Sequence, residues 1–499
     1  MICNQENKKI KMAKIEFIVP SVLNKGGGEK KLSLDAVTLQ DAFSKVSSQM
    51  GEDFKRKVFD LNGKPRPLIN IYVNGKNTRF AGNGMTRSLS DGDSIHILPA
   101  VAGGAEITRE DMQRYSRQIM LEEIGFTGME KLRKAHVSVI GVGGIGNPVV
   151  TQLTAMGIGK LKIIDRDVIE ISNLHRQHLY TEEDIGKVKV EAALERLRKL
   201  NPQVEIEAVP TSVTTYTVEN LVKGSDVVID ALDSIEARYA LNDACIKQNI
   251  PLIYAGALGM VGSVCTILPN KTACLRCMFP ALEEDEMPTC STEGVHPSIL
   301  YLVGGIQVSE AVKMIIGQQP SLANTLLYVD LTDLSFEKIQ MSRYDGCPSC
   351  GSKKIELATT VTGNSQESTQ ARGKLEDSGT VQQEQKTLVQ EEKRLIIEEL
   401  CGRDMGKRTF TITPTHQFSS EPIDLAAVIR NVEATGYKIK TRGNLGVTAI
   451  GGNDGKDSTN ANSSTISVSF LTSGAATIVG AKSEHEALAI YQTFMDGKH

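Results

Sequence analysis

Residues 136–165 read HVSVIGVGGIGNPVVTQLTAMGIGKLKIID, and the pattern changes several times along this stretch. An apolar strand over 136–140 leads into a glycine loop, a helix is expected over 148–156, and a second apolar strand follows over 161–165. Strand, glycine loop, helix and strand in this order are typical of a doubly wound α/β domain with a Rossmann-like parallel sheet. The four glycines of the loop are Gly141, Gly143, Gly144 and Gly146.

The glycine loop has the composition of a phosphate-binding loop. Without side chains its backbone can approach a phosphate closely, and the N-terminus of the following helix favours an anion. Asp165 ends the next strand, 19 residues after Gly146, where a carboxylate can accept hydrogen bonds from ribose hydroxyls. Glycines that only permit close packing are the alternative. The loop predicts a nucleotide site without deciding between NAD and ATP.

Charged residues further along the chain favour ATP. Arg176 and Lys189 can supply positive charge, and Asp233 follows a strand predicted over 227–230, where a carboxylate can hold Mg²⁺. Nucleotidyl transfer needs such groups because charge builds on phosphate oxygens as pyrophosphate leaves, whereas hydride transfer does not. Each residue taken singly is better explained as solvated surface. Their joint order carries the prediction.

Two CxxC pairs, Cys274 with Cys277 and Cys347 with Cys350, are separated by 69 residues. Each pair can present two thiolates to one ion, and two pairs complete a closed tetrahedral site for structural Zn²⁺. A redox dithiol and a chance pairing are the alternatives. We expect zinc to join the end of this domain to its middle.

In sequence order these motifs resemble the ThiF/MoeB adenylating enzymes, relatives of the ubiquitin-activating enzymes, from Thr108 to Gly351. The resemblance implies an enzyme that uses ATP and Mg²⁺, with the glycine loop on the phosphates and Asp165 on the ribose. It makes Asp233 the essential acid on the magnesium side. The other residues that it places at the nucleotide are Asp167, Asn173, Arg176, Gln177 and Lys189.

Two further roles follow only from this resemblance. The family's Arg-Tyr-x-Arg segment matches residues 114–117, which implies that Arg117 reaches into the nucleotide site of a partner subunit and that the protein is a homodimer. Cys290, in a loop with Pro, Thr and Gly, matches the family's reactive or sulfur-transfer cysteine. A buried, inert thiol is the alternative at this position.

The segment over residues 13–104 predicts a β-grasp fold, in which a mixed sheet cradles one helix. The expected elements are strands over 14–19, 69–73 and 94–98 and a helix over 39–50. The segment runs out as LPAVAGG and ends on Gly103 and Gly104, a tail that can thread a narrow channel or serve as a linker. Its strand order and its tail resemble the ubiquitin-like sulfur carriers of the ThiS and molybdopterin-synthase small-subunit type.

Two segments follow the domain predicted over 108–351. Residues 352–393 are rich in Ser, Thr, Gln, Glu and Lys and predict a flexible linker. Residues 394–499 return to strand and helix patterns and predict a small α+β domain. We find no catalytic constellation in this last segment.

Two helices of the central domain are predicted from local signals. Thr108, with Asp111 three residues later, is the capping-box start of a helix that runs to about Glu123. The apolar stretch over 298–316 is too polar for a membrane span and predicts an amphipathic helix. The polar residues that interrupt it are Gln307, Glu310 and Lys313.

Composition and charge exclude several classes of protein. The 499 residues carry 56 basic and 60 acidic side chains, and the net charge of −4 argues against a dedicated nucleic-acid binder or polybasic membrane binder. The sequence holds no run of 18 apolar residues, and its first 20 residues lack the apolar core of a signal peptide. Nine cysteines in such a chain favour metal or catalytic thiols over disulfides, and we expect a cytoplasmic protein.

Together these features predict a sulfur carrier fused to the enzyme that adenylates the carrier's C-terminal glycine with ATP. The product would serve molybdopterin or thiamine synthesis, tRNA thiolation or protein modification, with sulfur donated by a separate protein. Because Gly104 is joined to Ala105, the reacting carboxylate comes either from cleavage after Gly104 or from a separate carrier. The alternatives are an NAD-dependent oxidoreductase and a non-catalytic carrier or scaffold.

Overall fold

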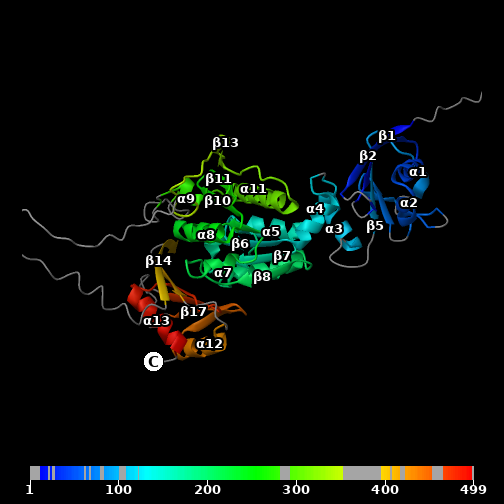
Figure 1. Ribbon diagram of the computed structural model, residues 1–499. Helices are drawn as coiled ribbons and strands as arrows, with labels where there is room; N and C mark the ends of the chain where they lie inside the picture. The colour runs from blue at the N-terminus through cyan, green and yellow to red at the C-terminus, as the bar shows by residue number, and fades with distance from the viewer. Residues whose placement is uncertain are drawn as a thin grey trace, which may run out of the picture. The chain divides into compact units, whose positions relative to one another are not determined.

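The computed structural model divides the chain into two compact units, Met1–Lys134 and Ala135–His499 (Figure 1). Each unit is described by itself. The residues that the structure describes are 12–20, 23–24, 28–60, 63–66, 69–78, 84–99, 108–121, 123–280, 282, 293–351, 395–404, 407–415, 422–451 and 465–496.

The first unit holds a five-stranded mixed sheet with the strand order β2-β1-β5-β3-β4. The strands β1 and β5 run parallel, with Phe17 opposite Ile95, and the other neighbouring pairs are antiparallel. Phe17 also meets Phe43 of helix α1 edge to face, with ring centroids 4.8 Å apart. This arrangement confirms the predicted β-grasp fold. The elements are β1 (Ala13–Val19), β2 (Lys30–Ala36), α1 (Leu39–Met50), α2 (Glu52–Val58), β3 (Ile69–Val73), β4 (Lys76–Asn77), η3 (Gly84–Thr86) and β5 (Ser94–Pro99).

Two helices, α3 (Arg109–Ile119) and α4 (Gly125–Lys134), complete the first unit. Thr108 caps α3 as predicted, since its hydroxyl accepts the Asp111 N–H at 3.1 Å and the Asp111 carboxylate accepts the Thr108 N–H at 2.7 Å. The prediction of one helix running to about Glu123 is wrong. Helix α3 ends at Ile119 with Met120 as its C-cap, and the chain then turns into α4, whose first residue Gly125 has a left-handed φ of 55°.

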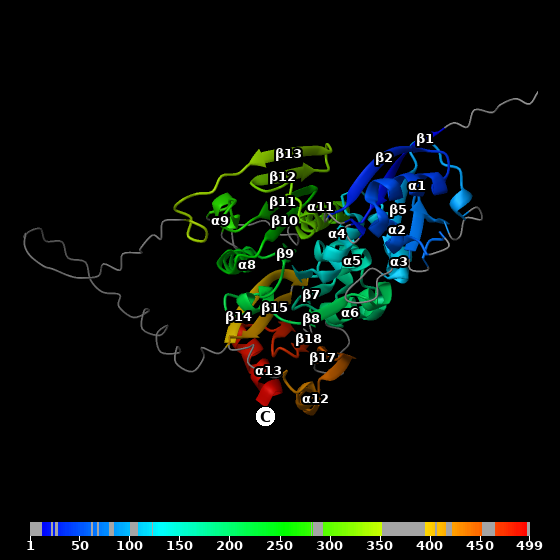
Figure 2. The same ribbon diagram turned by 45° about the vertical axis from the view of Figure 1, so that its right-hand side comes forward.

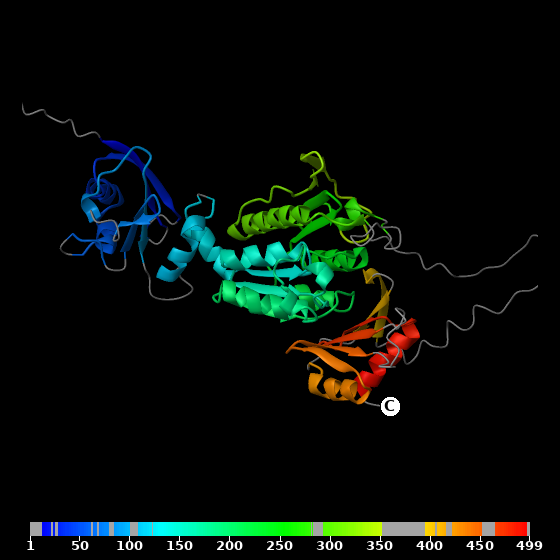
Figure 3. The ribbon, with the colours of Figure 1, turned by 180° about the vertical axis from the view of Figure 1, so that it is seen from behind.

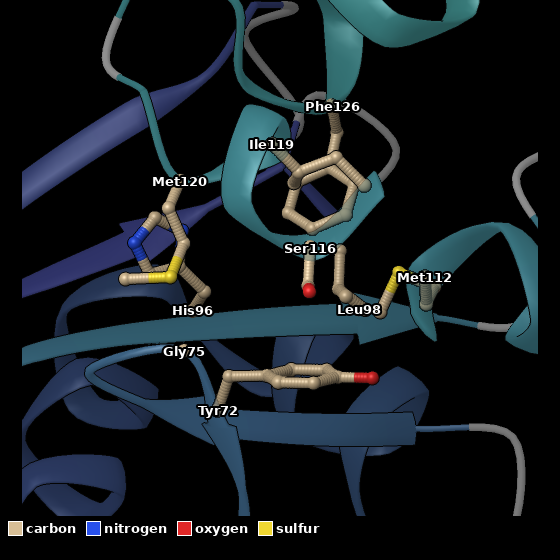
Figure 4. A pocket seen from close by; sticks show the side chains of 9 residues that line it. All are labelled: Tyr72, Gly75, His96, Leu98, Met112, Ser116, Ile119, Met120 and Phe126. Carbon is tan, nitrogen blue, oxygen red and sulfur yellow. The ribbon is translucent and has the colours of Figure 1, made fainter. Parts of the chain in front are cut away.

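A pocket lies between α3, α4 and the face of the sheet opposite α1 (Figure 4). Met120 fits against Gly75, where an added Cβ would lie 2.1 Å from the methionine sulfur. The pocket is a space left where α3 packs against the sheet. Its lining residues are Tyr72, Gly75, His96, Leu98, Met112, Ser116, Ile119, Met120 and Phe126.

The second unit is built on an eight-stranded sheet with the order β13-β12-β11-β10-β9-β6-β7-β8 (Figure 2). The five strands from β10 to β8 are parallel, and β11, β12 and β13 continue the sheet in antiparallel fashion. The strands are β6 (His136–Ile140), β7 (Lys160–Ile164), β8 (Glu205–Val209), β9 (Val227–Asp230), β10 (Leu252–Leu258), β11 (Val261–Ile267), β12 (Thr325–Asp330) and β13 (Ser335–Gln340).

Helices cover both faces of this sheet, which confirms the predicted doubly wound fold (Figure 1). Helix α5 contacts both α6 and α11, while α7 packs on α8. Strand β6 lies between β7 and β9, so the order of the strands reverses there, and ligands of such sheets bind at the carboxyl ends of strands next to this reversal. The helices are α5 (Gly146–Met156), η4 (Ile171–Asn173), η5 (Glu182–Asp184), α6 (Lys189–Leu200), α7 (Val218–Val222), α8 (Ile235–Gln248), α9 (Leu275–Met278) and α11 (Pro297–Ile316).

Helix α11 is the one helix in the described part of the chain that is long and apolar enough to cross a membrane by length and composition, but 56% of its most apolar window is buried inside the protein. It packs on β9, β10, β11 and α5. The prediction that it is amphipathic is wrong, because Gln307 and Glu310 are buried rather than solvated. Gln307 donates to the carbonyls of Asp230 and Ile253 at 2.7 and 3.0 Å, and Glu310 accepts the Leu322 N–H at 2.8 Å. Their hydrogen bonds let these polar side chains lie in the core.

The C-terminal domain, as we call the described residues from 395 to 496, is a six-stranded antiparallel sheet with the order β14-β15-β19-β18-β17-β16. Helices α12 and α13 pack against each other on one face of this sheet (Figure 3). Its elements are β14 (Leu395–Asp404), β15 (Lys407–Pro414), α12 (Leu425–Ala434), β16 (Lys438–Arg442), β17 (Gly446–Gly451), β18 (Ile466–Leu471), β19 (Ala476–Val479) and α13 (Glu484–Asp496).

Candidate functional site

The glycine loop joins the carboxyl end of β6 to the N-terminus of α5. A Cβ on Gly146 would lie 2.1 Å from the Gly141 carbonyl oxygen, and one on Gly141 would lie 2.4 Å from the carbonyl oxygen of Ala231. Packing therefore requires these two glycines. A Cβ on Gly144 would press on a leucine side chain at 2.7 Å, whereas one on Gly143 would meet nothing closer than 3.9 Å. The open space at Gly143 fits a ligand that approaches the backbone.

Val142 is the point at which the loop is held. Its N–H donates to the Asp165 carboxylate at 2.8 Å, and its carbonyl accepts from Asn147 Nδ2 at 2.7 Å and from the Tyr180 hydroxyl at 2.9 Å. Asn147 in turn accepts the Leu179 N–H at 2.9 Å. Sequence reasoning missed Asn147 and Tyr180. The sequence signal for Asn147 is its place directly after the last glycine of the loop. An amide side chain there would be unnecessary if the start of the helix were exposed to solvent.

Asp165 directly follows β7 and lies close to Asp167 and Lys189, two of the residues predicted to bind the nucleotide. Its second carboxylate oxygen accepts the Asp167 N–H at 2.8 Å. Burial raises the pKa of Asp165, while the nearby Lys189 ammonium favours its ionised form. Lys189 Nζ donates to Asp167 Oδ2 at 2.9 Å, and the two side chains are only 6% and 14% exposed. The structure thus brings three predicted residues together at the carboxyl end of the sheet.

Three more predicted residues lie on the turn around η4. Asn173 is buried and accepts the Glu170 N–H at 3.2 Å, and Arg176 Nη1 donates to the Ser172 carbonyl at 2.7 Å. Gln177 is 3% exposed, and its Oε1 has no hydrogen-bond partner among the described residues. Its Nε2 is the group that a Cβ on Gly143 would meet at 3.9 Å. The Gln177 amide nitrogen therefore lies beside the open backbone at Gly143.

Two acids lie at the carboxyl end of β9. Asp233, the predicted magnesium-side acid, is exposed one residue before the N-cap of α8. Asp230 is fully buried, and its Oδ2 lacks a hydrogen-bond partner in the described part of the chain. Burial raises the pKa of Asp230, and the Arg238 side chain lies 4.0 Å away. Sequence reasoning gave Asp230 and Arg238 no role, although two acids three residues apart at a strand end are a recognisable pattern.

The remaining single-residue predictions are not brought into this site by the described residues. Arg117 is exposed on α3 in the first unit. Cys290, Gly103 and Gly104 lie outside the described residues. The roles assigned to these four residues stay predictions.

The four predicted metal-ligating cysteines form one cluster, and their sulfur atoms all lie within 4.8 Å of one another. The Sγ atom of Cys274 lies 3.9 Å from that of Cys277 and 3.6 Å from that of Cys347, and the Sγ atoms of Cys277 and Cys350 are 3.4 Å apart. Sulfur ligands about 2.3 Å from a tetrahedral zinc lie about 3.8 Å apart. The cluster is compatible with zinc. It joins the chain that follows β13, which carries Cys347 and Cys350, to the segment around α9, which carries Cys274 and Cys277.

Two family models match the chain. The ThiF family model matches residues 115–349, and the ThiS family model matches residues 23–104. The first match contains the glycine loop, the paired Lys189 and Asp167, and three of the four clustered cysteines, and it ends one residue before Cys350. The second covers most of the β-grasp unit.

Two curated relatives agree with the ThiF match. The SAMP-activating enzyme E1 of Haloferax volcanii is 39% identical over 246 residues, which are 49% of this chain and 91% of that protein. The sulfur carrier protein adenylyltransferase of Thermus thermophilus is 37% identical over 255 residues, 50% of this chain and 94% of that protein. A crystal structure of E. coli MccB is 25% identical with a TM-score of 0.45, covering 52% of this chain and 77% of that one. By its identity to relatives that it covers almost end to end, and by its site, the chain belongs to the ThiF family.

Proposed function

We propose that this chain uses ATP to adenylate the C-terminal glycine of a ubiquitin-like sulfur carrier. The observation that carries the proposal is the presence of a ThiS-type segment and a ThiF-type nucleotide site on one polypeptide. A carboxylate is a poor electrophile, and converting it to an acyl adenylate makes it open to attack by sulfur. The Thermus relative's name describes this activation of a carrier.

The residues present fit ATP. The backbone at Gly143 is open to a phosphate, and the N-terminus of α5 favours the anion. Gln177 offers a buried acceptor to the nucleotide, and Lys189 offers a cation whose charge is balanced by Asp167 until phosphates arrive. Arg176 is the second cation that we assign to the phosphates, and we assign Asp165 to the ribose.

In the reaction that we propose, a glycine carboxylate attacks the α-phosphorus of ATP and pyrophosphate leaves, giving the acyl adenylate. Lys189 and Arg176 stabilise the charge that develops on the phosphate oxygens. Asp233, exposed at the carboxyl end of β9, is the acid that we assign to Mg²⁺. When bound, Mg²⁺ neutralises charge on the departing pyrophosphate. An oxidoreductase would leave the buried Lys189–Asp167 pair without a role.

We propose Zn²⁺ as the occupant of the cysteine cluster, with a structural role. The four sulfurs supply a complete tetrahedral set, so no position is left for a substrate. Zinc would therefore stabilise the fold and take no part in adenylation.

Isotope exchange between pyrophosphate and ATP, measured with an added carrier that has a free Gly-Gly end, tests the proposal. We expect exchange by the full chain and a loss of at least ~100-fold in Asp233→Ala, the scale for removal of a charge-stabilising group. Metal content and melting temperature should be unchanged in this variant. Carrier-independent NAD reduction without exchange would establish the oxidoreductase alternative. A folded chain with neither activity would leave only the scaffold.

The chain's own N-terminal segment is the carrier that we propose, released by proteolysis after Gly104. The Gly104–Ala105 peptide bond otherwise leaves no carboxylate to activate. A separate sulfur-donor protein and a homodimer in which Arg117 completes the neighbouring site are parts of the same proposal. Intact-mass analysis of protein from its native cells should reveal a fragment ending at Gly104. A full-length chain alone, active on an added carrier, would contradict the cleavage.

A further inference from the structure

The C-terminal domain contacts the stretch of the second unit that carries the proposed nucleotide residues. Most of this contact comes from the β16–β17 hairpin, residues 438–451, which we call the clamp hairpin. Strand β14 adds one ion pair. The contacted stretch runs from Arg166 to Glu191 and contains both members of the Lys189–Asp167 pair.

The clamp hairpin fixes the carbonyl of Gly186, three residues before Lys189. This oxygen accepts a hydrogen bond from the Thr441 hydroxyl at 2.6 Å and a second from the Thr448 hydroxyl at 2.9 Å. Thr441 and Thr448 are paired across the two strands of the hairpin, so the ladder sets the positions of both donors. The backbone that leads into Lys189 is therefore held from outside the ThiF-type fold.

The clamp hairpin also contacts the chain just after Lys189, through the side chain of Glu191. Glu191 is 8% exposed, and its carboxylate accepts the Asn444 N–H at 2.5 Å and the Leu445 N–H at 3.2 Å. The approach is close, because a Cβ on Gly443 would lie 2.0 Å from the carboxylate. Backbone N–H groups that donate to a buried carboxylate form strong, charge-assisted hydrogen bonds.

A third contact reaches the segment that carries the partner of Lys189. Arg166 precedes Asp167, and its Nη1 donates to Glu398 Oε2 of β14 at 2.6 Å. The Asp167 carbonyl accepts the Lys189 N–H at 2.9 Å, in addition to the ion pair between their side chains. The C-terminal domain thus holds both segments that meet in this pair.

We infer that the clamp hairpin positions Lys189 for the phosphates of ATP, which makes Thr441 and Thr448 positioning residues of the nucleotide site. This inference rests on the proposed function. A lysine side chain is long and flexible, and its ordering opposes binding. Holding the Gly186 carbonyl before Lys189 and the Glu191 carboxylate after it reduces that cost before the nucleotide arrives.

Calorimetric titration of the full chain with Mg·ATP tests this inference without requiring turnover. Thr441→Val with Thr448→Val removes both hydroxyls at constant shape, and we expect the Kd for ATP to rise about tenfold. The matched control is Thr413→Val, which removes the 2.8 Å hydrogen bond between Thr413 and Ser212 in another part of the same contact. The control should bind ATP like the parent. Replacing both threonines with serine keeps the hydroxyls and should restore the parent Kd.

A second measurement shows whether the effect passes through Lys189. In a Lys189→Gln background the valine pair should weaken ATP binding by less than about twofold, because the group being positioned is gone. An undiminished tenfold effect in that background overturns the inference, as does a valine pair that binds like its Thr413→Val control. If the parent melts cooperatively but binds no ATP, the proposed function fails first and the inference falls with it.

Discussion

Alanine at two positions of the glycine loop should separate the packing role of glycine from its ligand role. In Gly146→Ala the new Cβ would lie 2.1 Å from the Gly141 carbonyl oxygen, a backbone atom that cannot rotate away. This is more than 1 Å inside an ordinary contact, and overpacking of this kind costs about 3 kcal/mol. Gly146→Ala should therefore melt well below the parent.

Gly143→Ala should behave in the opposite way. Its Cβ would meet no atom closer than 3.9 Å, and Gly143 is not among the residues with positive φ. Replacing such a glycine restricts the unfolded chain and stabilises a protein by about 0.4–1 kcal/mol. The same methyl group would stand where a phosphate approaches, so we expect affinity for ATP to fall at least about tenfold, or 1.4 kcal/mol.

Thermal melting and calorimetric ATP titration of both variants check the two expectations side by side. The decisive result is Gly143→Ala, which should be as stable as the parent or more stable while binding ATP poorly. Tight ATP binding by Gly143→Ala would show that the nucleotide does not approach this part of the loop. A parent-like melting temperature for Gly146→Ala would show that the loop can relax, contrary to the packing argument.

Further predictions concern the metal site, the loss of stability at low pH and the hydrogen bonds that hold Val142 in the glycine loop. Cys347→Ser should lose the one zinc per chain that we expect by metal analysis and should melt at lower temperature; a parent protein purified without chelators yet free of zinc would contradict this. Burial raises the pKa of Asp184, but hydrogen bonds from Lys187, Thr181 and Arg196 outweigh burial. They lower this pKa to about 2, below its value in the unfolded chain. The stabilisation is therefore present at neutral pH and lost as pH falls from about 4 to about 2, so Asp184→Asn should narrow the difference in melting temperature between pH 7 and pH 3. Tyr180→Phe should cost about 1 kcal/mol by denaturant melts, because the Val142 carbonyl retains its second donor.

The fold class could be predicted because its signals are local. The strand that runs into Gly141, the helix that follows Gly146 and the aspartate at the end of the next strand require only neighbours in sequence. The cysteine cluster was equally readable, since CxxC spacing restricts both members of a pair to one turn of chain. Residues suited to coordinate an ion or to approach a phosphate can be recognised from their residue types and from their spacing in the sequence.

Features that depend on distant partners could not be read in this way. The amide of Asn147 acquires its role only when Leu179 and the Val142 carbonyl are brought to it. Gln307 and Glu310 looked like a solvated stripe, because their buried partners lie on other elements. Sequence periodicity reports polarity, and it cannot report whether a polar group has found a partner in the core.

Each hydrogen bond described above between the clamp hairpin and the stretch around Lys189 has a main-chain atom on one side, and this has an evolutionary consequence. The Gly186 carbonyl, like the Pro210 carbonyl that accepts the Ser473 hydroxyl at 2.6 Å, is an atom that every residue possesses. A residue that offers only its main chain to such a bond can be substituted without a compensating change in its partner, provided that the backbone path is kept. Covariation between the two sides should therefore be weak even though they touch, and this contact would be nearly silent in a comparison of homologous sequences.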